Sequence, residues 1–189
     1  TGVKNKEAFG HNFGIHYPGY EWPAGRPAKT APCYDRLTRE GAVWGAVYGW
    51  EIPLWFAPKG EEARDVWSYR TFNSMPHVGV ECRAVREGVG LYEMTPMSKF
   101  EVRGSGAEAW LNQILANRMP SKIGGIVLAH LLTNKGSVRC EFTVTRLGAS
   151  HFYLIGTPRG ERHDFDVLQK ALPADGSVQL TNATFERGG

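Results

Sequence analysis

The sequence has few cysteines, no long apolar run and no block of like charge. Its three cysteines, Cys33, Cys82 and Cys140, are odd in number and far apart, which suits neither a disulfide framework nor a paired zinc motif. We therefore expect free thiols in a reducing compartment and predict a cytoplasmic protein. No apolar stretch approaches the roughly 20 residues needed to span a bilayer, and residues 1–10 lack the apolar centre of a signal peptide. A membrane-spanning or secreted protein is not expected.

Charge and missing motifs argue against further classes. The net charge of +3 is spread along the chain without a run of five like charges, so neither nucleic acid nor a membrane surface is an expected partner. The six histidines form no paired motif such as H-E-x-x-H, and no metal is assigned. No G-x-S-x-G motif is present, so acyl-enzyme chemistry is not supported.

The first third of the chain differs in composition from the rest. Residues 1–75 hold most of the tryptophan and proline, and within 9–58 only 33–40 has a helical pattern. Because the segment is so rich in glycine, proline and aromatic residues, we expect it to have no core of its own. We interpret 1–75 as a bridging arm whose rings lie on another surface.

Residues 76–189 alternate between helical and extended patterns. A capping box formed by Ser105 and Glu108 predicts the start of one helix. The alternating residues 99–103 predict a half-buried strand, with the side chains of Lys99, Glu101 and Arg103 on its polar side. The whole order is helix 76–87, strand 99–103, helix 107–115, hairpin 126–132 and 138–146, strand 151–156, helix 161–172 and a strand from 178. This order predicts an α+β fold, with antiparallel or mixed sheets and helices packed on one face.

Glu141 is the first candidate for chemistry. In the segment VRCEFTVTR, alternation predicts that Val138, Cys140, Phe142 and Val144 share one face, and that Arg139, Glu141, Thr143 and Thr145 share the other. A glutamate on an outer strand face either lines a cleft or is solvated, and solvation is the commoner case. On the pattern alone, the solvated interpretation is favoured.

Two glycine-containing segments are weaker candidates. Residues 104–109, GSGAEA, fit a relaxed dinucleotide fingerprint, but the preceding strand alternates instead of being apolar on both faces. No acid follows the next strand, where Thr133 and Asn134 stand, so we interpret the match as a decoy. The segment 122–125, KIGG, is either a simple turn or a loop that approaches a flat ligand.

The residues between 81 and 147 carry a family resemblance. The text ECRAVREGVGLYEMTPMSKFEVRGSGAEAWLNQILANRMPSKIGGIVLAHLLTNKGSVRCEFTVTRL resembles the folate domain shared by the glycine-cleavage aminomethyltransferase and the dimethylglycine and sarcosine dehydrogenases. The earlier segments FGIHYPGYEWPAGRP, APCYDRL and GWEIPLWFAP resemble the bridge between flavin and folate domains in the dehydrogenase branch. The family's domain continues past the position of Gly189. The resemblance therefore implies an aminomethyltransferase folate-binding-like fold, incomplete at the C-terminus, with residues 76–189 as its N-terminal part.

The resemblance also implies a site. Glu141 matches an acidic position, usually Asp, that lies beside the pteridine and N10 of tetrahydrofolate, and its implied role is to accept or steer a proton during one-carbon transfer. The residues expected to contact the folate are Tyr92, Met97, Thr133, Asn134, Thr143 and Thr145. Glu is one methylene longer than Asp, which displaces the charge.

Three functions follow as hypotheses. The first is a tetrahydrofolate-dependent methylene or aminomethyl transfer module of a flavin-dependent dimethylglycine- or sarcosine-type dehydrogenase or demethylase, with FAD only in a domain absent from this chain. The second is a non-catalytic folate-binding or interaction fragment of the same family. The third is a nucleotide-dependent oxidoreductase that uses Gly104 and Gly106. The implied partners are a folate, a methylated amine and a flavin domain or subunit; self-association is left open.

Overall fold

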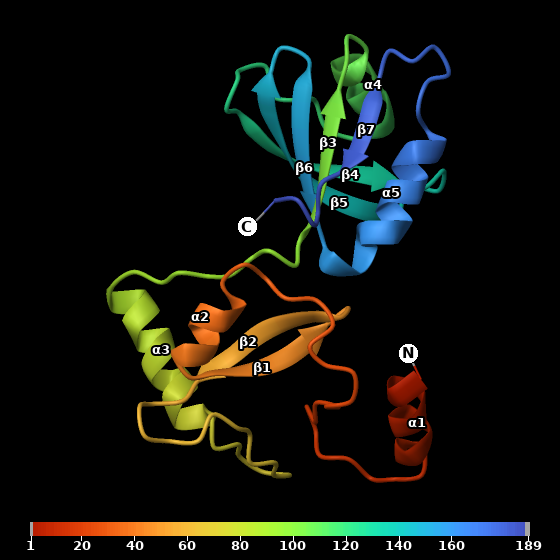
Figure 1. Cartoon of the computed structure of the whole chain (residues 1–189). Helices are drawn as coiled ribbons and strands as arrows, with labels where there is room; N and C mark the ends of the chain where they lie inside the picture. Colours follow the sequence, from red (N-terminus) through yellow and green to blue (C-terminus); the bar gives the residue numbers. More distant parts are fainter. Residues whose placement is uncertain (1, 188–189) are drawn as a thin grey trace. The chain divides into compact units, whose positions relative to one another are not determined.

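The computed structural model describes residues 2–187, and the chain divides into two compact units, Thr1–Glu93 and Met94–Gly189 (Figure 1). Each unit has its own sheet and its own buried cluster. Within 2–187, no helix has the length and apolar character required to cross a membrane. The predicted boundary at 75/76 and the interpretation of 1–75 as a bridging arm stay predictions.

The first unit is built around a two-stranded antiparallel sheet. Its helices are α1 (Gly2–His11), α2 (Tyr34–Arg39) and α3 (Met75–Glu87), and its strands are β1 (Ala42–Val47) and β2 (Trp50–Phe56). Tyr48 and Gly49 have φ values of 50° and 87°, so they form the two-residue turn typical of a β-hairpin. We did not predict α1 or this hairpin.

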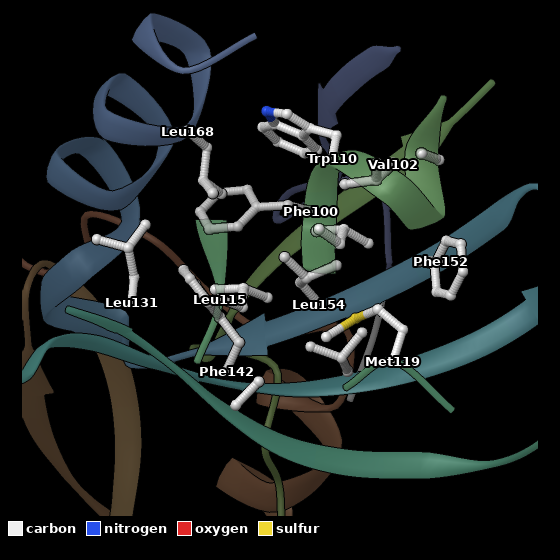
Figure 2. Packing of buried hydrophobic residues seen from close by; sticks show 14 of the residues in the cluster. Phe100, Val102, Trp110, Leu115, Met119, Leu131, Phe142, Phe152, Leu154 and Leu168 are labelled. Carbon is white, nitrogen blue, oxygen red and sulfur yellow. The ribbon is translucent and has the colours of Figure 1, made fainter. Parts of the chain in front are cut away.

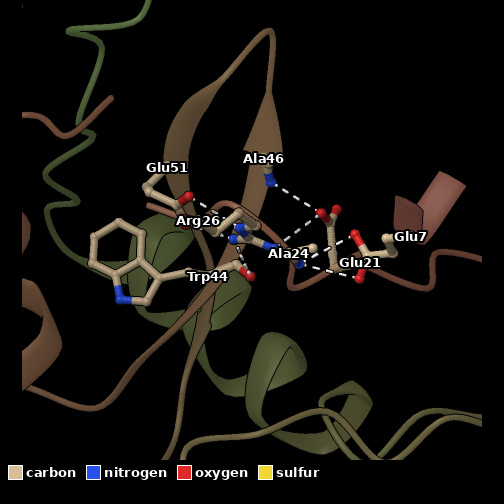
Figure 3. A network of polar contacts seen from close by, with 7 residues as sticks. All are labelled: Glu7, Glu21, Ala24, Arg26, Trp44, Ala46 and Glu51. Atoms are coloured by element: carbon tan, nitrogen blue, oxygen red, sulfur yellow. Dashed lines mark hydrogen bonds and ion pairs between the residues drawn. The ribbon is translucent and has the colours of Figure 1, made fainter. Parts of the chain in front are cut away.

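A small core and an arginine network hold the first unit together. Val43, Trp55 and Ala57 are buried against one another, so the expectation that this segment has no core of its own is wrong. Arg26 donates to the carboxylates of Glu51 and Glu21 and to the carbonyl of Trp44 (Figure 3). Because Glu51 is almost fully buried, this charge-assisted pairing ties the irregular segment before the hairpin to β2.

The second unit is a five-stranded antiparallel sheet in the order β4-β5-β6-β3-β7. The strands are β3 (Ser98–Arg103), β4 (Ile126–Leu132), β5 (Val138–Gly148), β6 (His151–Gly156) and β7 (Gln179–Asn182). The helices are α4 (Ala107–Ile114) and α5 (Glu161–Lys170), the latter preceded by the 3-10 turn η1 (Pro158–Gly160). The order of elements confirms the α+β prediction.

One face of this sheet is covered by both helices. Trp110 and Leu111 of α4 and Leu168 of α5 pack on apolar side chains from the strands (Figure 2). The Trp110 indole N–H also donates to the Ala171 carbonyl oxygen at 2.7 Å, which joins the two helices. The fully buried strand residues on this inner face are Phe100, Val102, Ala129, Phe142, Val144, Phe152 and Leu154. Neither helix of the second unit, within its described residues 94–187, covers the opposite, outer face of β4 and β5.

The predicted capping box does not form. The N-cap of α4 is Gly106, no side chain caps it, and Ser105 is exposed. Glu108 instead pairs with the buried guanidinium of Arg146, which also donates to the Pro120 carbonyl. Because a buried arginine needs a compensating charge, this tertiary contact takes the carboxylate away from the helix N-terminus.

Two of the three polar side chains of β3, Lys99 and Glu101, are buried, which corrects the expectation of a half-buried strand; Arg103 at its end is exposed. Lys99 is 1% exposed, and its ammonium group donates to the carbonyls of Thr95 and Met97 at 2.6 and 2.8 Å. Glu101 is 7% exposed and accepts from Arg103 and Arg187. Hydrogen bonds from Arg103 lower the pKa of the Glu101 carboxyl despite its burial.

A leucine-to-alanine substitution is expected to lower the free energy of unfolding by different amounts on the two faces of the sheet. Leu154→Ala removes a fully buried side chain from the inner face, and we expect it to lower the free energy of unfolding by about 2–5 kcal/mol. Leu128→Ala, the matched change on the outer face where the side chain is 49% exposed, should cost under about 1 kcal/mol. Urea denaturation followed by circular dichroism measures both. Equal losses would contradict the assignment of the faces.

Candidate functional site

A bulge in the β4–β5 hairpin decides which residues share a face. Leu131 pairs with Cys140 and Leu132 pairs with Val138, so Arg139 is the extra residue on β5. Alternation towards the core therefore begins at Cys140, and Val138 is 61% exposed instead of lying on the inner face as predicted. From Cys140 onward the predicted alternation is confirmed.

Glu141 lies on the outer face of β5, and its partner is His130 on β4. The two residues are directly opposite each other in the register, and His130 Nε2 lies 2.8 Å from Glu141 Oε2. A carboxylate oxygen accepts this hydrogen bond from the imidazole tautomer that carries its hydrogen on Nε2. The side chains are 31% and 52% exposed, respectively.

The surroundings of Glu141 leave its second oxygen open. The β5–β6 register pairs Thr143 with Ile155, and β6 ends at Gly156, so Glu141 extends past the end of β6. Among residues 2–187, the Glu141 side chain has no partner besides His130. Oε1 is therefore available to a hydrogen-bond donor.

Thr143 and Thr145 continue the same face of β5. Both are half-buried, and their cross-strand neighbours on β4 are Leu128 and Ile126, which are 49% and 65% exposed. The outer face thus joins one carboxylate and two hydroxyl groups to exposed apolar side chains.

The other predicted residues lie elsewhere. Thr133 and Asn134 are exposed in the turn between β4 and β5, where the Ser137 amide donates to the Thr133 hydroxyl at 3.2 Å. Met97 is half-buried ahead of β3, and its carbonyl accepts from Lys99. Tyr92, which is 65% exposed, belongs to the first unit. The structure therefore groups Glu141, Thr143 and Thr145 on one face.

Two cavities of the second unit do not involve the predicted residues. One, of about 370 Å³, adjoins α4 and is lined by Glu108, Asn112, Leu115, Ala116, Asn117, Arg118 and Met119. The other, of about 310 Å³, is lined by Ile114, Leu131, Leu132, Arg139, Val167, Lys170 and Ala171. Glu141 borders neither, so its setting is an open sheet face. Residues 2–187 also contain no cluster of three or more His, Cys, Asp or Glu side chains arranged to hold a metal ion.

Packing accounts for the dinucleotide-like glycines. A Cβ on Gly104, whose φ is 123°, would lie 2.2 Å from the Ser177 carbonyl oxygen, and one on Gly106 would lie 2.5 Å from the Ser177 hydroxyl. The preceding β3 has antiparallel neighbours on both sides, unlike the first strand of a dinucleotide-binding sheet. In the KIGG segment, Gly124 donates to the Arg146 carbonyl, which fastens this turn to the end of β5.

The inner face beneath Glu141 holds an unreactive thiol. Burial raises the pKa of Cys140 to about 12, and the neighbouring Asp164 carboxylate adds to the effect. Since the thiolate is the reactive form, Cys140 is not a nucleophile at neutral pH.

The fold is that of an α+β domain of the aminomethyltransferase type. The solved structure of the glycine cleavage system aminomethyltransferase T from Bartonella henselae matches 81% of this chain and 37% of that chain, with a TM-score of 0.62 and 25% identity. Residues 33–188 match the GCVT N-terminal domain, and the chain belongs to this family.

Dehydrogenases are among the curated relatives. The mitochondrial dimethylglycine dehydrogenase of Rattus norvegicus is 32% identical over 189 residues, covering 100% of this chain and 22% of the relative. The mitochondrial sarcosine dehydrogenase of Homo sapiens is 28% identical over 175 residues, covering 78% and 19%. The chain thus spans about a fifth of the length of these relatives. The resemblance to the dimethylglycine and sarcosine dehydrogenase family is confirmed.

His130 is the residue that sequence reasoning missed. In the sequence it interrupts the apolar run 126–132, and a polar residue at a strand position opposite an acid is a usable signal. The hairpin register was needed to pair them, and the bulge at Arg139 shifts that register by one. The pairing could not be read from symmetry about the turn.

The thiols provide a test of this arrangement. Cys33 and Cys82 are exposed, whereas Cys140 is buried with a pKa of about 12. At pH 8 the Cys140 thiolate fraction is about one in ten thousand, so we expect a disulfide reagent to titrate two thiols quickly in the folded protein and three in urea. Rapid reaction of all three thiols in the folded protein would show that the reagent reaches Cys140, and would contradict burial of the inner face of β5.

Proposed function

We propose that the outer face of β5 contributes to a tetrahydrofolate site used in one-carbon transfer, in partnership with a flavin-dependent dehydrogenase or demethylase of the dimethylglycine and sarcosine type. The observation that carries this proposal is the position of Glu141: an exposed carboxylate with one open oxygen, in a chain of the GCVT N-terminal domain family. The names of the related dehydrogenases support a methylated amine as the source of the one-carbon unit.

The residues present fit a folate ring. Its N–H groups need acceptors, which Glu141 and the hydroxyl groups of Thr143 and Thr145 supply, and its flat faces need apolar contact, which Ile126 and Leu128 supply. Glu141 borders neither of the two cavities described above, so this face would form only one wall of the proposed site. We therefore expect weak binding by this chain alone.

The chemistry assigned to this chain is proton handling. Tetrahydrofolate, when bound, supplies the nitrogen that takes up the one-carbon unit. Oε1 of Glu141 would accept the proton released by that nitrogen, and the negative charge would favour a cationic iminium carbon close by. The threonine hydroxyls would orient the ring without changing charge.

A second candidate is a folate-binding or interaction fragment without catalysis. The 52% exposure of the Glu141 side chain favours it, because a carboxylate in contact with bulk water loses much of its electrostatic effect. The first candidate predicts both folate binding and transfer. The second predicts no transfer, and as an interaction fragment it need not bind folate. The described cysteines are free, which suits a reducing compartment such as the cytoplasm, although the relatives named above are mitochondrial.

Glu141→Gln separates the two candidates. We expect millimolar tetrahydrofolate to raise the melting temperature of the wild-type chain, because a ligand that binds only the folded state stabilises it, and we expect Glu141→Gln to retain part of that shift. Folate-dependent transfer, assayed in the chain joined or added to its flavin partner, should fall by about 10²-fold or more. Glu186→Gln is the matched control, since Glu186 is exposed outside the sheet.

The outcomes of these measurements distinguish the three functional hypotheses. Normal transfer by Glu141→Gln would sink the catalytic role, and binding without transfer in the wild type would leave the fragment hypothesis. A melting temperature that rises with NAD or FAD but not with tetrahydrofolate would overturn folate binding altogether.

A further inference from the structure

We propose that His130 is a positioning residue that fixes the carboxylate of Glu141 in one orientation. The inference rests on the proposed function for its consequence in transfer, but its physical content is local to the β4–β5 hairpin. It concerns the contact between His130 Nε2 and Glu141 Oε2, which are 2.8 Å apart.

The need for such a residue follows from the length of the glutamate side chain. Glutamate has one more rotatable bond than aspartate, so an unrestrained, 52% exposed carboxylate would sample several rotamers and spread its charge over several positions. Displacement of a catalytic group by about 1 Å can lower a rate by about 10²-fold. A hydrogen bond to an ionised acceptor is short and directional, and it selects one of these rotamers.

The backbone supplies the rigidity that the histidine needs. His130 lies on β4 at the edge of the sheet, and it stands directly opposite Glu141 in the register. On either side of it, the inward-facing Ala129 and Leu131 are buried in the core. The imidazole is therefore attached to a backbone that cannot slide, because a slip of one residue would expose those two side chains.

The contact with His130 also makes the two carboxylate oxygens of Glu141 inequivalent. Oε2 is held by the imidazole, and Oε1 has no partner among residues 2–187. A ligand that donates a hydrogen to Oε1 thus meets an acceptor whose direction is already set. The shared face with Thr143 and Thr145 then fixes where that ligand can lie.

Nuclear magnetic resonance tests the positioning without any assay of activity. Three-bond couplings across χ1 of Glu141 should report one rotamer in the wild type and rotamer averaging in His130→Leu. His130→Gln keeps an N–H donor on a side chain of similar reach and should restore most of the single-rotamer values. Glu186, whose side chain has no partner among the described residues, is the internal control and should be averaged in every variant. Averaged Glu141 couplings in the wild type, or unchanged couplings in His130→Leu, would overturn the proposal.

Steady-state kinetics of the transfer reaction test whether positioning by His130 affects catalysis. We expect His130→Leu to lower kcat by about 10- to 100-fold with little change in KM, and to add no further loss in a Glu141→Gln background, because the two residues act as a unit. Full additivity in the double variant would overturn a role exerted through Glu141. A wild type that shows no transfer would count against the proposed function alone, since the couplings decide the positioning by themselves.

Discussion

The bulge at Arg139 is the constraint on which the candidate site depends. It places one extra residue in β5, and from Cys140 onward every second side chain enters the core while the others face outward. Without it, His130 would stand opposite Cys140, and the thiol and Phe142 would exchange faces with Glu141 and Thr143. The fully buried Phe142 and Val144 oppose that exchange, because exposing either would cost about 1.5–3 kcal/mol. The hydrophobic core therefore sets the direction of the carboxylate.

The division of the sheet into two faces gives each a distinct role. The inner face is buried from solvent beneath α4 and α5. Burial and the neighbouring Asp164 raise the pKa of the Cys140 thiol on this face, which keeps it protonated. The outer face of β4 and β5 carries a histidine, a glutamate and two threonines among exposed aliphatic side chains. The core side chains and the residues of the proposed site thus lie on opposite faces of one strand, so we expect changes in the outer residues to leave the packing intact. This separation is a common way for one fold to accommodate different activities.

Much of the second unit could be predicted from periodicity, because its strands alternate and its helices carry one apolar stripe. The hairpin of 126–146, the strand at 151–156 and the helix from 161 are all confirmed. Local signals failed where tertiary contacts override them. Glu108 pairs with Arg146 instead of forming a capping box with Ser105. Lys99 and Glu101 are buried with partners that include groups outside β3, the Thr95 carbonyl and Arg187. The first hairpin was missed because Pro53 and Gly45 are unfavourable inside strands, and a bulge between Val43 and Trp44 accommodates the proline. For the site, Glu141 came from a family resemblance, and His130 required the register.

We propose that the outer face of β5 is the surface that meets tetrahydrofolate, and a titration of the ¹⁵N-labelled chain with tetrahydrofolate tests this most directly. We expect the perturbed amide resonances to cluster on β4 and β5, around His130, Glu141, Thr143 and Thr145. Perturbations confined to residues 2–93, or to the cavity around Asn112 and Met119, would contradict it, as would a spectrum that does not change at millimolar ligand.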